Sequence, residues 1–296
     1  MVFDLKTYLA ERKQWVEQAL ERYLPVEGEW PARLHESMLY SIRAGGKRLR
    51  PILAIAACEA VGASVERVIP VAAALEMIHT YSLIHDDLPA MDDDELRRGK
   101  PTNHKIYGEA MAILAGDALL TEAFRVMSRH RHPEVEPHVL MEVIGAIADA
   151  SGSKGMAGGQ VVDLESEKKK ISLPELERLH RHKTGRLIRV SVEAGARLGG
   201  GSSGQVEALG LYGEKIGLAF QIADDVLDIE GGAEIGKDVG SDLAREKSTY
   251  PSLLGIDQSK NLARKLSDEA TELLKNFDQR AEPLREIARY VVQRRS

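Results

Sequence analysis

The chain has 296 residues, of which 43% are hydrophobic and 29% are charged, so it is long enough to bury a sizeable core. Its formal net charge of -6 argues against a nucleic-acid-binding protein, and Cys58, the single cysteine, excludes an intramolecular disulfide. No apolar run reaches the ~18 residues that a membrane span needs, and the N-terminus lacks the pattern of a signal peptide. We therefore expect a cytoplasmic protein without stable membrane insertion.

Helical periodicity dominates the sequence, and no segment shows convincing strand alternation. We expect helices over residues 5–23, 31–42, 52–61, 65–87, 110–130, 135–150, 173–198, 205–229, 260–277 and 281–294. Between them, the glycines of 152–159 predict a flexible segment, 199–204 a tight loop between packed helices, and 230–248 a mobile loop. The pattern predicts an all-α protein of about ten helices, with a single domain over residues 1–296.

Two acidic clusters lie in or beside apolar helical sequence. The first is HDDLPAMDDD at residues 85–94, and the second is QIADDVLD at residues 221–228. Carboxylates in such surroundings cost free energy unless a cation compensates them. Mg²⁺ is the simplest compensator, since it binds carboxylate oxygens together with substrate phosphates. The clusters therefore predict a metal–diphosphate site between two acidic walls.

The second cluster has the spacing of one helix face. Asp224 and Asp228 are one turn apart, and Gln221 lies three residues before Asp224 on the same face. Asp225 is rotated by about 100° and need not join them. The plainer alternative is a helix cap or a solvated acidic face, although three acids within five positions repel one another.

The first cluster does not fit a regular helix. Asp86 and Asp92 are six residues apart, about 240° around a helix, with Pro89 between them. Proline can bulge or kink a helix, and looping out two residues would restore a one-turn spacing. The spacing alone leaves three pairings open: Asp86 with Asp92, Asp86 with Asp93, or Asp87 with Asp94.

Several basic residues lie at the expected N-terminus of a helix, where positive charge is destabilising. Lys47, Arg48 and Arg50 flank the beginning of the helix that Pro51 opens, and their charges oppose its macrodipole. A docked anion would reverse this cost, so the segment predicts a second diphosphate site rather than a surface basic turn.

Further polar residues have two interpretations each. Arg97 and Arg98 either neutralise the acids or bind phosphate with their planar guanidinium groups. His79 is either a core histidine or a ligand, and His85 could orient Asp86. The lysines at 183, 237 and 247 are either solvated or supply positive charge around the metal site.

Several stretches together resemble one known family. They are GGKRLRP at 45–51, IHTYSLIHDD at 78–87, RRG at 97–99, GGQ at 158–160, HKTG at 182–185, QIADDVLD at 221–228 and KSTYP at 247–251. The chain resembles the short-chain trans-isoprenyl diphosphate synthases, and most closely the bacterial farnesyl diphosphate synthases. The resemblance implies an all-α isoprenoid synthase fold around a deep central cavity, and a homodimer.

The resemblance also implies residue roles. The primary Mg²⁺ contacts are Asp86, Asp92 and Asp224, supported by Asp87, Asp225 and Asp228. The residues that bind the allylic diphosphate are Arg97, Lys183, Thr184, Gln221 and Lys237, with Lys247 nearby and Lys183 counted as catalytic. The isopentenyl diphosphate site consists of Lys47, Arg50, His79 and Arg98. Tyr81, with Ser82 beside it, sets product length, and an aromatic residue at 81 goes with a C15 product. About three Mg²⁺ ions are expected, with Mn²⁺ as an alternative.

The implied activity is a prenyltransferase reaction that makes farnesyl diphosphate from isopentenyl, dimethylallyl and geranyl diphosphates. The alternatives are a geranyl or geranylgeranyl diphosphate synthase, a metal phosphohydrolase using His85 and Asp86, and a non-catalytic subunit that binds prenyl diphosphates. One departure from the family pattern is Glu246, where a glycine is expected before Lys247, and residues 231–242 are not closely matched.

Overall fold

The computed structural model describes residues 3–230 and 247–293. Its elements in chain order are α1 (Leu5–Tyr23), α2 (Ala32–Arg43), α3 (Leu49–Ala60), a 3₁₀ turn (Val65–Arg67), α4 (Ile69–Asp86), β1 (Leu96–Arg97), β2 (Lys100–Pro101), α5 (Asn103–Tyr107), α6 (Glu109–Ser128), α7 (Pro137–Ser151), α8 (Met156–Ser166), α9 (Leu173–His180), a π-helical turn (Arg181–Gly185), α10 (Arg186–Leu198), α11 (Ser203–Glu230), α13 (Tyr250–Leu254), α14 (Ile256–Leu273), a 3₁₀ turn (Gln279–Ala281) and α15 (Glu282–Gln293). The predicted all-α class is confirmed.

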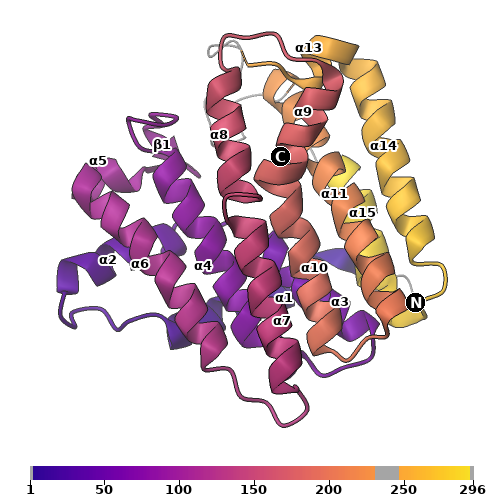
Figure 1. Ribbon diagram of the computed structural model, residues 1–296, viewed down its shortest axis with the longest axis horizontal. Coiled ribbons are helices and arrows are strands. Elements are labelled where there is room, and N and C mark those ends of the chain that lie inside the picture. Colours follow the sequence, from indigo (N-terminus) through magenta and orange to yellow (C-terminus); the bar gives the residue numbers. More distant parts are fainter. Residues whose placement is uncertain (1–2, 231–246, 294–296) are drawn as a thin grey trace.

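The helices form a bundle, as Figure 1 shows. Their buried side chains make two apolar cores. One core gathers side chains of α4, α6 and α7, and the other gathers those of α3, α10, α11, α14 and α15. The two cores meet where α3 packs against α10. The packing there is so close that a Cβ atom on Gly195 of α10 would clash with the backbone of Ala54 in α3. This arrangement places α4 and α11, which carry the two acidic clusters, inside one bundle.

Helix α4 is buried on almost every side, as its continuous apolar sequence predicts. Its buried carboxylate, Glu76, accepts a hydrogen bond of 2.7 Å from Arg48, and both side chains are at most 2% exposed. Arg48 precedes α3 in a left-handed conformation, with φ of 51°, and also donates to the carbonyl of Ile42. The ion pair therefore fixes the start of α3 against α4.

Several predicted boundaries need correction. The helix expected over 65–87 begins with a separate 3₁₀ turn, and the stretch expected to run from 173 to 198 is divided by the π-helical turn. The flexible segment predicted at 152–159 is wrong in its second half, because α8 begins at Met156. Helix α13 and the short hairpin of β1 and β2 were not expected. Most of the mobile loop predicted at 230–248 lies outside the described residues.

Gly159 shows why a glycine-rich stretch became a helix. A Cβ atom on this residue would lie 2.3 Å from the backbone nitrogen of Lys183. The glycine therefore lets α8 pack directly against the π-helical turn, and its small size, not its flexibility, explains its presence. In the ranges that the structure describes, no helix combines the length and apolar character needed to cross a membrane.

The buried ion pair makes a testable contribution to stability. Glu76→Gln leaves the Arg48 guanidinium buried without its anionic partner, so we expect the free energy of unfolding to fall by roughly 3 kcal/mol. Arg43→Met is the matched control, since Arg43 pairs with Glu21 and Glu27 at the surface and its loss should change the value by less than ~1 kcal/mol. Urea denaturation measures both. Equal effects for the two variants would contradict a structural role for the buried pair.

Candidate active site

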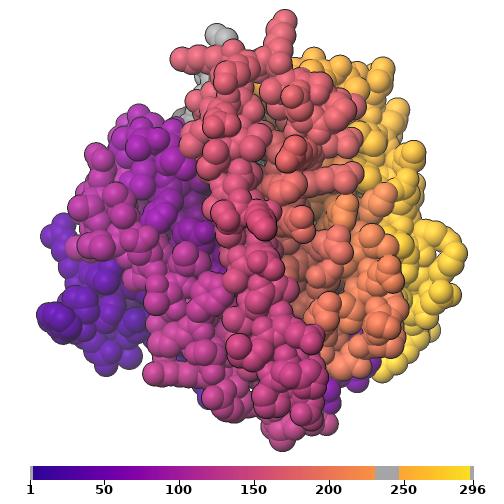
Figure 2. Space-filling view, viewed as in Figure 1, coloured from indigo at the N-terminus to yellow at the C-terminus, as the bar shows by residue number. Residues whose placement is uncertain are grey.

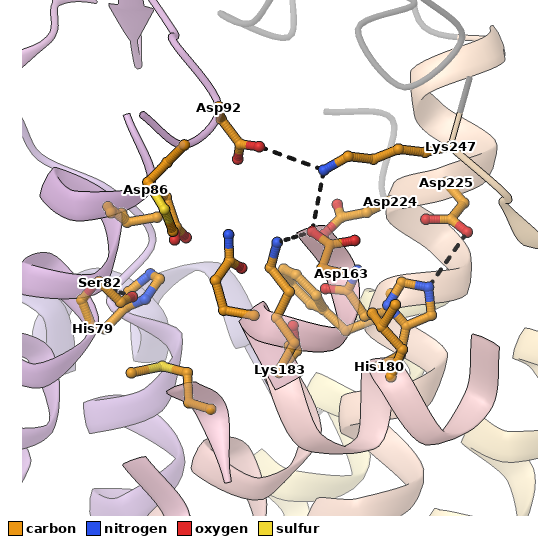
Figure 3. A pocket seen from close by; sticks show the side chains of 18 of the residues that line it. His79, Ser82, Asp86, Asp92, Asp163, His180, Lys183, Asp224, Asp225 and Lys247 are labelled. Atoms are coloured by element: carbon orange, nitrogen blue, oxygen red, sulfur yellow. Dashed lines mark hydrogen bonds and ion pairs between the residues drawn. The ribbon is translucent and has the colours of Figure 1, made fainter. Parts of the chain in front are cut away.

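A cavity of about 950 Å³ lies between α3, α4, α8, the π-helical turn and α11. It is lined by nearly all of the predicted site residues: Lys47, Arg50, His79, Tyr81, Ser82, Asp86, Asp92, Arg97, Arg98, Lys183, Thr184, Gln221, Asp224, Asp225, Asp228 and Lys247. Asp87 does not line it, and Lys237 lies outside the described residues. Side chains more than a hundred residues apart in sequence therefore meet in one space, as Figure 3 shows.

The first acidic bank forms where α4 ends. The helix stops at Asp86, and the backbone N–H of Asp92 returns to donate a 2.8 Å hydrogen bond to the Asp86 carbonyl. The expected bulge within a continuing helix is wrong, because the chain leaves the helix and turns back. The turn brings Asp86 and Asp92 together at the cavity, while Asp93 is exposed and does not line it.

Asp87 has a supporting role beneath this bank. It is buried and accepts a 2.8 Å hydrogen bond from Nε of Arg97, whose Nη2 also contacts Asp87 and donates to Asp94 at 2.9 Å. Burial disfavours the charge of Arg97, but Asp87 and Asp94 more than offset this and raise its pKa. Of the two interpretations of Arg97, these contacts agree with the first, in which Arg97 neutralises the charges of Asp87 and Asp94.

Asp86 itself is poorly compensated. Burial, together with the charges of Asp92 and Asp87, raises the pKa of Asp86 to about 6, although Lys183 and Arg97 act in the opposite direction. A carboxylate with a raised pKa beside further acids is a site where added positive charge is strongly favoured.

The second bank lies across the cavity on α11, as Figure 3 shows. Gln221, Asp224 and Asp228 line the cavity together, in agreement with their predicted common face. Asp225 is only 5% exposed and accepts a 2.9 Å hydrogen bond from the backbone N–H of Tyr250. It therefore fixes the start of α13 to α11.

Two lysines reach between the banks. Lys183 lies in the π-helical turn and donates to Asp163 at 2.5 Å, and Lys247 donates to Asp163 at 3.1 Å and to Asp92 at 3.4 Å (Figure 3). Burial disfavours the charge of Asp163, but Lys183 and Lys247 more than offset this and lower its pKa. The lysines hold positive charge in the space between the carboxylates.

Another part of the same cavity is basic, and it is called the basic pocket below. Arg50, His79 and Arg98 line it, and burial lowers the pKa of each, to about 10 for Arg50. Arg50 and Arg98 also lower the pKa of His79. Positive charge crowded in this way favours an anion, so the geometry agrees with the predicted anion site. Arg48, however, is committed to Glu76.

The hairpin and the glycine pair build this pocket. Arg98 and Gly99 both have positive φ, 56° and 74°, at the turn between β1 and β2. The guanidinium of Arg98 lies over Gly46, where an added Cβ atom would be 2.5 Å from its carbon. The absence of a side chain at Gly46 thus makes room for the Arg98 guanidinium.

Tyr81 lines the cavity and packs against the core of α4, α6 and α7. Its ring meets the ring of His85 edge-on, with centroids 5.7 Å apart. His85 Nε2 lies 3.0 Å from the carbonyl oxygen of Ile113 in α6, and the ring lies against Gly116. These contacts hold the ring against α6, and a role of His85 in orienting Asp86 stays a prediction.

The residues that sequence reasoning missed lie mainly on α8. Asp163 interrupts an apolar stretch, Val161-Val162-Asp163-Leu164, and a lone acid in such a stretch was the available signal. Gln160 also lines the cavity, one turn away. Gln160 belongs to the GGQ stretch that carried the resemblance, but neither residue was given a role, because no helix was predicted after the flexible segment at 152–159.

The donor set fits a divalent hard cation that shares its ligands with a substrate. Among residues 3–230 and 247–293, no group of three or more potential ligands converges on one point. Each bank instead offers carboxylates to the cavity, which leaves coordination positions for phosphate oxygens and water. That incomplete protein shell is the usual manner of Mg²⁺ binding in phosphate-handling sites.

Comparison with known proteins identifies the family. The polyprenyl synthetase family model matches residues 31–291. The chain belongs to this family. It is 50% identical over 277 residues to a farnesyl diphosphate synthase of Geobacillus stearothermophilus, covering 93% of each chain. It is 48% identical over 294 residues to a geranylgeranyl diphosphate synthase of Cyanophora paradoxa, covering 99% of this chain and 97% of that one.

A solved structure agrees with the fold. An FPP/GFPP synthase from Zymomonas mobilis superposes with a TM-score of 0.86 at 42% identity, covering 97% of this chain and 98% of that one. The predicted resemblance, the isoprenoid synthase fold and the trans-prenyltransferase class are confirmed.

The charge of Asp86 should destabilise the metal-free protein. Because its folded pKa of about 6 exceeds the ordinary value of 3.8, ionisation favours the unfolded state as the pH rises through this window. Asp86→Asn should therefore raise the free energy of unfolding by on the order of 1 kcal/mol at pH 7 in EDTA.

The difference in stability between Asp86→Asn and the wild type should depend on pH. The advantage of Asp86→Asn should vanish below pH ~4, grow up to pH ~6 and then stay constant. Mg²⁺ with inorganic diphosphate should stabilise the wild type more than the variant. A variant less stable than the wild type at pH 7 in EDTA would contradict the proposed charge crowding.

Proposed function

We propose that this chain makes (2E,6E)-farnesyl diphosphate by joining isopentenyl diphosphate first to dimethylallyl diphosphate and then to geranyl diphosphate. One observation carries the proposal: two carboxylate banks and a cluster of basic side chains line the same cavity. An enzyme that joins two diphosphates needs two anion sites of this kind, and only the donor has to lose its diphosphate.

The allylic donor is assigned to the acidic mouth. Lys183, Lys247, Thr184 and Gln221 line the space between the banks and offer hydrogen-bond donors to diphosphate oxygens. Lys183 and Lys247 contact Asp163 before substrate binds, which holds their charges near the position of the leaving group. Positioned cations of this kind stabilise negative charge as it develops on the departing diphosphate.

Metal binding is assigned to Asp86, Asp92 and Asp224, with about three Mg²⁺ ions expected and Mn²⁺ as an alternative. Bound Mg²⁺ would supply Lewis-acid neutralisation of the leaving diphosphate. Asp228 lies one turn beyond Asp224 and supports the second bank. Asp87 holds the surroundings of the first bank through Arg97, and Asp225 holds those of the second through the backbone of Tyr250. Lys237 lies outside the described residues, and its role at the allylic diphosphate stays a prediction from the family resemblance.

The acceptor is assigned to the basic pocket of Lys47, Arg50, His79 and Arg98. These side chains would hold the diphosphate of isopentenyl diphosphate and direct its double bond towards the allylic carbon. Heterolysis of the C1–O bond leaves an allylic cation, the double bond attacks C1, and a proton passes to the released diphosphate. The low pKa of His79 keeps its imidazole neutral, so it serves as a hydrogen-bonding group in the pocket.

The C15 product rests on Tyr81, which lines the cavity below Asp86 with Ser82 beside it. An aromatic ring there would stop the growing chain. The relatives do not decide the product, because a farnesyl and a geranylgeranyl diphosphate synthase are about equally similar to this chain. Geranyl or geranylgeranyl diphosphate is accordingly the alternative product.

Other predicted alternatives find less support. A phosphohydrolase that pairs His85 with Asp86 is disfavoured, since the His85 ring lies against α6. A non-catalytic binding subunit would not need carboxylates on both sides of the cavity. We further propose a single domain over residues 1–296, a cytoplasmic location and a homodimer. Helices α6 and α7 lie on the face shown in Figure 2. Three exposed apolar residues of these helices support the homodimer: Ile113, Leu114 and Met141.

The activity is tested by incubating the protein with isopentenyl and dimethylallyl diphosphates and Mg²⁺, followed by product sizing. We expect a C15 diphosphate as the main product, full loss of turnover in excess EDTA, and recovery when Mg²⁺ is restored. Asp224→Asn should lower kcat by at least ~100-fold, since charge stabilisation at the leaving group is lost. Turnover that persists in EDTA would refute the proposed metal dependence.

Product length is tested by Tyr81→Ala. Removing the ring opens the cavity along the growing chain, so products should shift from C15 to C20 and longer while the total rate of condensation stays within about tenfold. Tyr81→Phe, which keeps the ring and removes only the hydroxyl, is the control and should leave the product as C15. Chromatography of dephosphorylated products measures both. An unchanged chain length in Tyr81→Ala would exclude its role as the cavity floor.

A further inference from the structure

Gln160 is a buried amide whose hydrogen-bonding capacity is unused. The residue is 9% exposed and lines the cavity, and neither Oε1 nor Nε2 hydrogen-bonds to any residue in the described parts of the chain. Leaving a buried polar group unpaired costs roughly 1–3 kcal/mol, so nearly all such groups in folded proteins have partners. An apolar residue of similar size would avoid this cost. The amide is therefore explained best by a partner that arrives with the substrate.

The position of Gln160 marks a boundary within the cavity. On the same face of α8, Asp163 lies three residues later and holds Lys183 and Lys247. Met156 lies four residues earlier, lines the cavity too, and belongs to the apolar core of α4, α6 and α7. Gln160 thus stands between the cations of the mouth and the apolar interior, which is where the allylic carbons must lie if the lysines hold the diphosphate.

The backbone makes this position rigid. Gly159 brings α8 against the backbone of Lys183, so the helix cannot move towards the π-helical turn. The Gln160 side chain, on this tightly packed helix, therefore contacts the allylic substrate at a fixed position along the substrate. Preorganised dipoles of this kind stabilise charge that develops in a transition state without reorganising during the reaction.

We propose that Gln160 is a catalytic residue whose amide dipole stabilises the charge separation of the allylic donor as its C1–O bond breaks. The inference rests on the proposed function and deepens it. Both electrons of the bond leave with the diphosphate oxygen, and C1 to C3 share the positive charge. The carbonyl oxygen of Gln160 faces the allylic cation, and its NH₂ group faces the leaving oxygen. The amide itself neither gains nor loses a proton.

The test compares two unreactive donor analogues that differ in charge. One is an allylic thiolodiphosphate, which is neutral at the allylic carbons and does not ionise. The other is a prenyl diphosphate in which an ammonium nitrogen replaces the carbon that becomes cationic. The ratio of their dissociation constants, measured by calorimetry with Mg²⁺, reports stabilisation of the cation separately from binding of the diphosphate.

Two substitutions should move this ratio in opposite directions. Gln160→Leu removes the dipole and should weaken binding of the ammonium analogue by ~10–100-fold relative to the thiolodiphosphate, with kcat lowered by ~100-fold and KM changed by less than ~3-fold. Gln160→Glu keeps the shape and adds a negative charge, so it should favour the ammonium analogue relative to the wild type. Met156→Leu, one turn away, is the control and should leave the ratio unchanged.

The outcomes are distinguishable. Opposite shifts in the two variants support the role, and an unchanged ratio in both would overturn it. Equal weakening of both analogues in Gln160→Leu would also overturn it, because it would show an ordinary packing role. If the wild type formed no prenyl product while binding both analogues, the proposed function would fail, and the analogue ratio would still decide whether Gln160 responds to positive charge.

Discussion

Gathering like charges inside a low-dielectric cavity costs free energy, and this protein does so twice. Asp86 and Asp92 share one end of a helix, and their mutual repulsion together with burial raises the pKa of Asp86. Arg50 and Arg98 lie together in the basic pocket, where burial lowers their pKa values. Each charge surplus is relieved by a ligand of opposite sign. The metal-free, substrate-free protein is therefore electrostatically frustrated in the places where its ligands are expected to bind.

The rest of the scaffold holds these charges in place. The buried pair of Arg48 and Glu76 fixes α3 to α4, and Asp87 fixes Arg97 beneath the first acidic bank. Asp225 ties α11 to α13 through a backbone amide. Some charged residues near the cavity thus orient their neighbours, which explains why adjacent residues of one motif, such as Asp86 and Asp87, have different environments. This division resembles the way metal sites depend on the partners that orient their ligands.

The sequence predicted the fold class and the second acidic bank because both follow from helical periodicity. Gln221, Asp224 and Asp228 needed only 3.6 residues per turn to be placed on one face. The first bank could not be derived in this way, since the return of Asp92 to the carbonyl of Asp86 is a turn outside any regular helix. Asp163 and Gln160 were missed because glycines that permit close helix packing look the same in a sequence as glycines that permit flexibility. The partner of Arg48 is 28 residues away and could not be read from local spacing.

The account depends on two carboxylate banks that bind one metal–diphosphate complex from opposite sides. Anomalous diffraction from crystals grown with Mn²⁺ and an unreactive allylic thiolodiphosphate tests this directly. The account predicts manganese peaks between the diphosphate and Asp86 with Asp92, and between the diphosphate and Asp224. A diphosphate bound at Arg50 and Arg98 alone, with no manganese at either bank, would contradict it.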